Sequence, residues 1–126
     1  MNTRYAVRVF GTAAIFNVVV GVSGLLAPSV GSRVLGVPLP ENRVFLHIAM
    51  WLIAVLGVGY ALVALRPARN RDLMLVGGIG KMLVLPLMLA AWRRGDVAAP
   101  GIGAGVIDFV LAVLFFDVMR RFPARA

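Results

Sequence analysis

The sequence predicts an all-α integral membrane protein: a four-helix bundle with short loops and both termini in the cytoplasm. Three observations support this fold class. The 126 residues are 61% hydrophobic, and their mean hydropathy is +0.95. Only 14% of the residues are charged, whereas soluble domains are usually about a quarter charged. The apolar residues form long blocks without the periodicity of an amphipathic helix or a strand, which indicates lipid on most sides.

Four blocks are long enough to cross a membrane. A spanning helix needs roughly 20 mostly apolar residues. Backbone in lipid must satisfy its own hydrogen bonds, which favours helices, and the alternating segments of a transmembrane barrel are missing from the sequence. We therefore expect one domain, residues 1–126, with spans at 9–27, 44–65, 73–92 and 101–119.

The connections between the blocks carry the helix-breaking residues. The first connection contains Pro28, Pro38 and Pro40, and its stretch Ser29–Leu35 is expected to form a short interfacial helix or re-entrant segment. The second, "RPARNRD", and the third, "RRGDVAAPG", are short, so they predict antiparallel neighbours.

The arginines predict the orientation. Eight fall on the side of both chain ends and four on the other, and short basic loops face the cytoplasm. The first block is longer than a signal-peptide core and has no small-residue cleavage site, so we expect it to be retained. The first group is Arg4, Arg8, Arg66, Arg69, Arg71, Arg120, Arg121 and Arg125, and the second is Arg33, Arg43, Arg93 and Arg94.

Composition also excludes several functions. The net charge of +8 comes from residues that flank the apolar blocks, where they set topology and meet anionic headgroups, so we expect membrane lipids and no nucleic acid as partners. The absence of cysteine excludes disulfides, thiolate metal sites and thiol catalysis. The stretch "GGIGK" lies inside a span and lacks the Ser or Thr of a phosphate-binding loop. No metal site and no cofactor are predicted.

Lys81 is the residue that most needs an explanation. It lies near the middle of "LMLVGGIGKMLVLPLMLAAW", and a charge at that depth costs at least a few kcal/mol. A lysine at midplane cannot easily extend to the interface. It therefore requires a partner, a water-filled cavity or the loss of its charge. Pro86 follows within the same span and predicts a kink there.

The expected partners of Lys81 are ranked by their predicted depth in the membrane. Asp108, in the adjacent fourth span, is the expected ion partner, either as a structural pair that locks two helices or as a functional pair. Asn17 near the middle of the first span and Tyr60 in the second are further polar candidates. Asp117 is instead expected to be neutralised by Arg120 and Arg121, three and four residues later.

His47, in "FLHIAMW", has three interpretations. It is an interfacial histidine that reaches headgroups, a member of a polar pocket with Asp108 and Lys81, or a single imidazole ligand to a haem or chlorophyll metal. Trp51 lies on the same helical face, an arrangement also found in pigment-binding helices.

Small residues predict where helices touch, because close backbone approach replaces the hydrophobic driving force in lipid. Such contacts pack one bundle internally or form a seam between copies. The residues are Gly21, Gly24, Gly57, Ala61, Gly77, Gly78, Gly80, Gly101 and Gly105.

Four apolar blocks in a short chain, together with "GVSGLLAPS" and "GVGYALVALRPARNRDLMLVGGIGK", resemble small bacterial inner-membrane proteins of the DoxX-like group. The resemblance covers the architecture of the whole chain. It differs at Asn17, because DoxX-like proteins tend to carry a basic residue early in the first span. It implies an inner-membrane location. Proteins of this group are mostly described as accessory or uncharacterised, so the resemblance implies little about function.

Three functions remain open from the sequence. The first is a non-enzymatic accessory or ligand-binding subunit with a buried polar cluster, within a homo-oligomer or a larger membrane complex. The second is a minimal dimeric transporter or channel that uses Lys81 and Asp108 as its coupling site. The third is a small enzyme that acts on an isoprenoid or another lipid.

Overall fold

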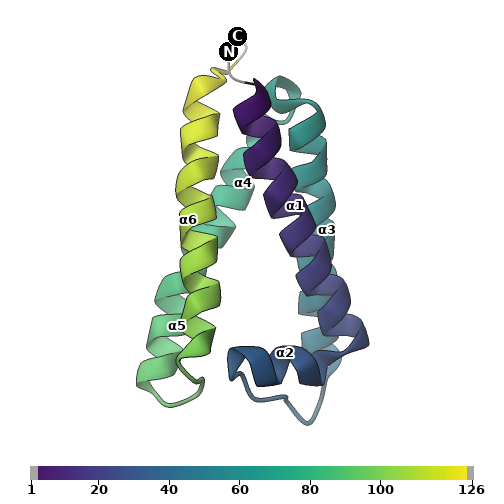
Figure 1. The fold of residues 1–126 in the computed structure, drawn as a ribbon, viewed down its shortest axis with the longest axis vertical. Coiled ribbons are helices and arrows are strands. Elements are labelled where there is room, and N and C mark those ends of the chain that lie inside the picture. Colours follow the sequence, from purple (N-terminus) through teal and green to yellow (C-terminus); the bar gives the residue numbers. More distant parts are fainter. Residues whose placement is uncertain (1–2, 125–126) are drawn as a thin grey trace.

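The computed structural model describes residues 3–124, and within this range the secondary structure is entirely helical (Figure 1). Four stretches are long and apolar enough to cross a membrane: Thr3–Leu26, Val44–Leu65, Arg71–Arg93 and Pro100–Arg121. The predicted all-α class with four apolar helices is therefore confirmed. The elements are α1 (Thr3–Leu26), α2 (Pro28–Leu35), α3 (Val44–Leu65), the 3-10 helix η1 (Pro67–Arg69), α4 (Arg71–Met82), α5 (Val84–Arg93) and α6 (Pro100–Arg121).

The four long helical stretches extend beyond the predicted spans at the majority of their ends. The largest difference is at α1, which begins at Thr3, whereas the predicted span begins at Val9. Arg4 and Arg8 set that predicted boundary, but a charged residue ends only the apolar block and is fully compatible with a helix. Arg125, one of the eight arginines in the orientation argument, lies outside the described residues.

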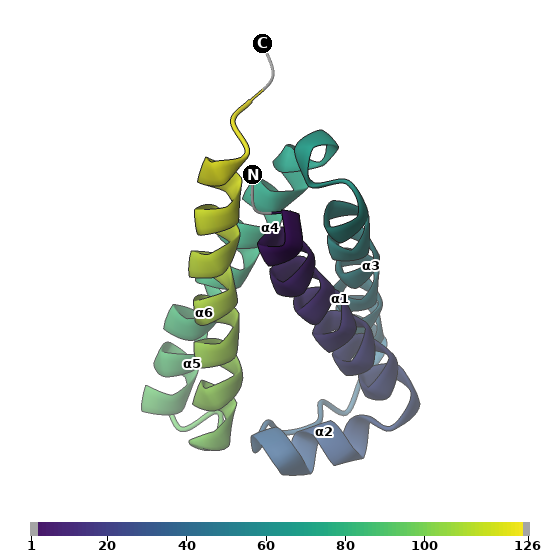
Figure 2. The same cartoon turned by 45° about the horizontal axis from the view of Figure 1, so that its top comes forward.

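The start of α1 and the end of α6 lie at the same end of the molecule, which we call the terminal end (Figure 1). The helices converge there and diverge toward the opposite end, which α2 crosses (Figures 1 and 2). We call this second end the α2 end. Four passages through the bundle return the end of α6 to the side on which α1 starts.

Helix α2 is the short helix expected between the first two spans. Pro28 occupies its first turn, and Gly36 ends it in the left-handed conformation with φ 65°. The Ala98 amide donates a 2.9 Å hydrogen bond to the Gly36 carbonyl. This bond ties the end of α2 to the segment that precedes α6, so α2 bridges the two diverging groups of helices.

Helices α1 and α3 approach each other closely through glycine. A Cβ atom added to Gly21 would lie 2.6 Å from the Met50 carbonyl oxygen and 2.7 Å from the Ala54 amide nitrogen. A Cβ atom on Gly57 would lie 2.8 Å from a Val18 methyl carbon. The predicted helix contacts at Gly21 and Gly57 are therefore present within the bundle, where backbone approach replaces large interdigitating side chains.

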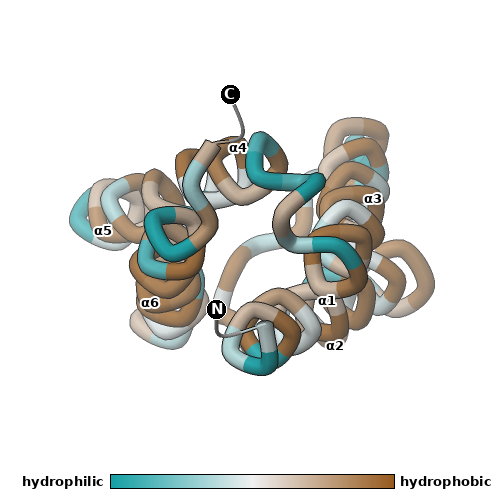
Figure 3. Tube along the Cα trace, turned by 90° about the horizontal axis from the view of Figure 1, so that it is seen from above, coloured by the Kyte–Doolittle hydropathy of each residue, from teal (hydrophilic) through white to brown (hydrophobic). Residues whose placement is uncertain are grey.

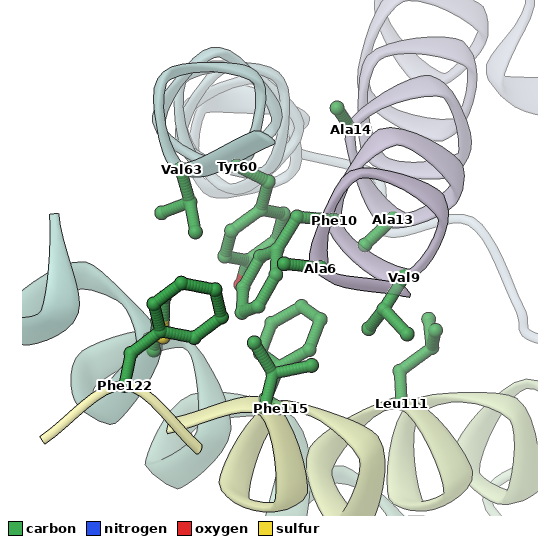
Figure 4. Packing of buried hydrophobic residues seen from close by; sticks show 12 residues of the cluster. Ala6, Val9, Phe10, Ala13, Ala14, Tyr60, Val63, Leu111, Phe115 and Phe122 are labelled. Atoms are coloured by element: carbon green, nitrogen blue, oxygen red, sulfur yellow. The ribbon is translucent and has the colours of Figure 1, made fainter. Parts of the chain in front are cut away.

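The core lies toward the terminal end and is centred on three aromatic rings (Figure 4). The ring centroids of Phe10 and Phe115 are 4.1 Å apart and stacked, and Tyr60 meets Phe115 edge-on at 4.9 Å. Apolar residues elsewhere mostly point outward: at most 33% of the residues in each apolar window are buried. Seen from the terminal end, most of the helices carry the colour of hydrophobic residues, and hydrophilic residues lie at connections (Figure 3). Such a surface suits lipid as its solvent.

The third span is broken next to its lysine. Helix α4 ends at Met82 and α5 begins at Val84, with Leu83 between them. Pro86 has no amide hydrogen to donate to the carbonyl of Met82 four residues earlier. The irregularity predicted from Pro86 is therefore present as a break at Leu83, two residues after Lys81.

Candidate functional site

Lys81 lies in the last turn of α4, near the middle of the Arg71–Arg93 span, and is 5% exposed. Glycines one turn earlier in α4 allow side chains of the neighbouring helices to approach its backbone closely. A Cβ atom on Gly77 would lie 2.5 Å from the Tyr60 ring, and one on Gly78 would lie 2.8 Å from the Phe116 ring. Helix α4 is thus packed between α3 and α6 at the level just before Lys81.

The Lys81 ammonium donates two hydrogen bonds to side chains from other helices. Nζ lies 2.6 Å from Asp108 Oδ1 on α6 and 2.9 Å from Asn17 Oδ1 on α1. Asn17 Nδ2 in turn donates to the Ile53 carbonyl of α3 at 3.2 Å. The four spans therefore meet in one chain of hydrogen bonds. Such charge-assisted bonds are about twice as strong as neutral ones.

Two aromatic faces complete the environment of the ammonium. Lys81 Nζ lies 5.6 Å from the ring centroids of both Phe16 and Tyr60, within cation–π range. Tyr60 is 2% exposed and belongs to the core. The structure thus brings Tyr60 to the site, where it presents its ring face to the charge.

The two charged partners differ in access. The Asp108 side chain is 18% exposed and that of Lys81 only 6%. Asp108 Oδ2 receives no hydrogen bond from residues 3–124, although Oδ1 is held by Lys81. Every fully buried side-chain nitrogen or oxygen of the described residues has a partner, so Oδ2 is not fully buried. It remains an available acceptor for a hydroxyl, an amine, a proton or water.

His47 and Trp51 lie elsewhere, and the expectation that His47 joins a buried cluster with Lys81 and Asp108 is wrong. His47 is exposed in the first turns of α3, six residues before Ile53, or roughly 9 Å along the helix axis. Trp51 is 60% exposed on the same face. This position suits the interfacial interpretation of His47. No set of three metal-ligating side chains occurs within residues 3–124.

An apolar pocket of about 380 Å³ lies at the α2 end, between α1, α2 and the start of α3. Val20, Gly24, Val34 and Met50 are among its lining residues. Val20 follows Asn17 by one turn of α1, so the pocket begins roughly 5 Å along the helix from the hydrogen-bonded cluster. Ligand pockets are typically apolar cavities of about 300–1,000 Å³ with a few polar groups.

Asp117 forms a separate cluster at the terminal end. Arg120 and Arg121 contact its carboxylate at 2.6 Å and 3.1 Å, which confirms the predicted local neutralisation. Tyr5 adds a 3.0 Å hydrogen bond to Asp117 Oδ2 that the sequence analysis did not predict. This arrangement ties α1 to α6 and lies apart from Lys81.

Phe16 and the Ile53 carbonyl also belong to the Lys81 site, and the sequence does not predict either of them. Phe16 is one of many large apolar residues in α1, and a helix carbonyl carries no residue-specific signal. Neither residue differs in type from its outward-facing apolar neighbours, so only the packed helices identify them.

Comparisons of the chain with protein-family models, with curated proteins and with solved structures found no match.

Proposed function

We propose that this protein is a non-enzymatic subunit of the bacterial inner membrane that binds a lipid-like ligand at the Lys81–Asp108 pair. The observation that carries the proposal is the available Oδ2 atom of Asp108. A carboxylate within an apolar span is costly, and an intramembrane ionisable residue is a functional candidate. Lys81 holds one oxygen of this carboxylate in place, and the other stays open to a ligand.

The surroundings indicate the ligand's chemistry. The open oxygen accepts a hydrogen bond, so the ligand's polar end carries a hydroxyl or an amine. The pocket beneath α2 is lined almost entirely by apolar side chains and begins one turn of α1 from Asn17. A ligand with a hydrocarbon portion in this pocket and a hydrogen-bond donor at Asp108 is an amphiphile with one polar end.

Filling the pocket tests this proposal. A Cβ atom on Gly31, which lines the pocket, meets no atom within 4 Å, so a side chain can begin there without displacing a neighbour, and Gly31→Phe adds an aromatic ring at the pocket. We expect native mass spectrometry to detect a small amphiphile on the wild-type protein extracted in mild detergent. Gly31→Phe should retain much less of it, and Asp108→Asn should also lose it because the charged acceptor is gone.

Gly103→Phe is the matched control, because its Cβ also meets no atom within 4 Å and Gly103 does not line this pocket. Asp96→Asn, in an exposed ion pair with Arg94, controls for the loss of one carboxylate. Both controls should retain the ligand. Wild-type protein without any bound amphiphile, or equal retention in all variants, would contradict the proposal.

A transporter or channel is the second candidate, and the break at Leu83 favours it. A discontinuous helix beside charged groups near the middle of an apolar span is a feature of transporter sites. In that case Lys81 and Asp108 would couple movement of a proton or substrate. Proton-dependent flux in liposomes that disappears in Asp108→Asn would support this candidate over the first.

A further inference from the structure

A second pocket, of about 430 Å³, lies at the terminal end, where α3 passes into η1. Its lining residues are Leu62, Leu65, Arg66, Arg69 and Asn70. Asn70 Nδ2 donates hydrogen bonds of 2.9 Å and 3.0 Å to the carbonyls of Leu62 and Arg66. These bonds hold η1 against the end of α3, so Arg66 and Arg69 emerge from an ordered turn around the pocket.

No described residue neutralises the two arginines of this pocket. Within residues 3–124, the side chains of Arg66 and Arg69 form no ion pair and no hydrogen bond. Arg120 and Arg121 at the same end differ, because both contact Asp117. The connection between α3 and α4 is hydrophilic when viewed from this end (Figure 3). Two guanidinium groups without a partner among the described residues therefore border one pocket.

The same pocket has an apolar side. Leu62 is 49% exposed and Leu65 is 77% exposed, and both belong to the final turns of a helix apolar enough to cross a membrane. At the end of a helix that crosses a membrane, basic side chains reach the lipid headgroups and apolar side chains of the last turns lie beside the acyl chains. A ligand that satisfies both sides carries an anionic phosphate and hydrocarbon chains.

We propose that this pocket is a binding site for an anionic glycerophospholipid. The phosphate lies between the guanidinium groups of Arg66 and Arg69, whose planar donors suit phosphate oxygens, and the acyl chains run along Leu62 and Leu65. The site is independent of Asp108 and of the ligand proposed there. It gives the terminal end one selective lipid contact in addition to the general attraction of basic residues to anionic headgroups.

Lipid titration of the purified full-length protein tests the site. Phosphatidylglycerol should raise the thermal midpoint and bind in native mass spectra at lower concentrations than phosphatidylcholine. In Arg66→Gln/Arg69→Gln the apparent affinity for phosphatidylglycerol should fall roughly 30-fold, since each basic residue near a membrane surface contributes about one kcal/mol and 1.4 kcal/mol is tenfold. Arg93→Gln/Arg94→Gln removes the same charge at the α2 end and should keep wild-type affinity.

Two further arms separate the alternatives. Inorganic phosphate at millimolar concentration should not displace the lipid; displacement would identify a site for the free anion and overturn the proposal. Equal affinity for the two lipids, or an equal loss in the two double variants, would also overturn it. The lipid comparison on wild-type protein does not depend on a variant, so the proposal remains testable even if Arg66→Gln/Arg69→Gln folds poorly.

Discussion

The Lys81 ammonium lies 2.9 Å from the side-chain oxygen of Asn17, although 64 residues separate the two in sequence. The amide group of Asn17 is oriented at both ends, since its oxygen accepts from Lys81 and its nitrogen donates to the Ile53 carbonyl. Asp108 completes the site from α6. The Lys81 ammonium therefore bonds to two helices, α1 and α6, that diverge toward the α2 end. Removing its charge should weaken the connection between those helices.

The first prediction concerns the ion pair. Lys81→Met leaves Asp108 without its counter-ion, and Asp108→Leu leaves the ammonium bonded to Asn17 but without a counter-ion. Breaking one side of a buried pair typically costs about 3–5 kcal/mol, whereas replacing both partners costs much less. Each single variant should lower thermal stability in detergent, and the double variant should recover most of it. Recovery is incomplete because Asn17 Oδ1 loses its donor, which costs about 1–3 kcal/mol.

Function in these variants separates a structural from a functional pair. A double variant that is stable and still binds its ligand assigns the pair a structural role, and one that is stable but inactive assigns it a role in binding or coupling. If the single effects are small and simply add, the two side chains do not interact energetically, and the pairing would be wrong.

The second prediction concerns the contact between α1 and α3. Gly57→Ala places a Cβ atom 2.8 Å from a Val18 methyl carbon and 3.0 Å from the Ala14 carbonyl oxygen. Overpacking of this kind costs about 1–3 kcal/mol, more than the gain of up to about 1 kcal/mol in helix propensity. We expect a lower melting temperature in detergent.

Gly59→Ala is the control on the same helix. A Cβ atom at Gly59 meets nothing within 4 Å, so only the gain in helix propensity remains and stability should be unchanged or higher. A stabilised Gly57→Ala variant would show that α1 and α3 are not in close backbone contact.

The third prediction concerns orientation. The start of α1 and the end of α6 share one end of the bundle, and the excess of arginines at that end predicts that it faces the cytoplasm. A periplasm-active reporter fused to the C-terminus should therefore give no signal, whereas a cytoplasm-active reporter should. Strong periplasmic activity would indicate inverted insertion.

The fourth prediction concerns self-association. Four short helices enclose little interior, and Asp108 keeps 18% of its side-chain surface exposed within a span. Contact with a second copy or with another membrane protein would cover this polar surface. We expect oligomers or a mixed complex in native mass spectra from mild detergent. Monomers at every protein concentration, without a partner after extraction from native membranes, would refute this expectation.

The elements of this fold follow largely from the sequence. Four spans, the short helix Pro28–Leu35 and the break near Pro86 were all predictable, because each depends on residues adjacent in the chain. Apolar length, proline chemistry and the need to satisfy backbone hydrogen bonds in lipid act locally. The same reasoning established that a lysine at mid-span needs a partner.

The tertiary structure decided which residues meet that lysine. Asp108 and Asn17 reach it, Phe16 and Tyr60 cover it, and His47 lies outside the site despite its polar character. These outcomes depend on the relative rotation and height of the helices. Both are set by contacts between distant segments, such as Gly21 and Gly57 between α1 and α3, and Gly77 and Gly78 beside α3 and α6. Periodicity within one helix carries no information about the register between two helices, so the partners of Lys81 could be ranked from the sequence but only the packed structure selects them.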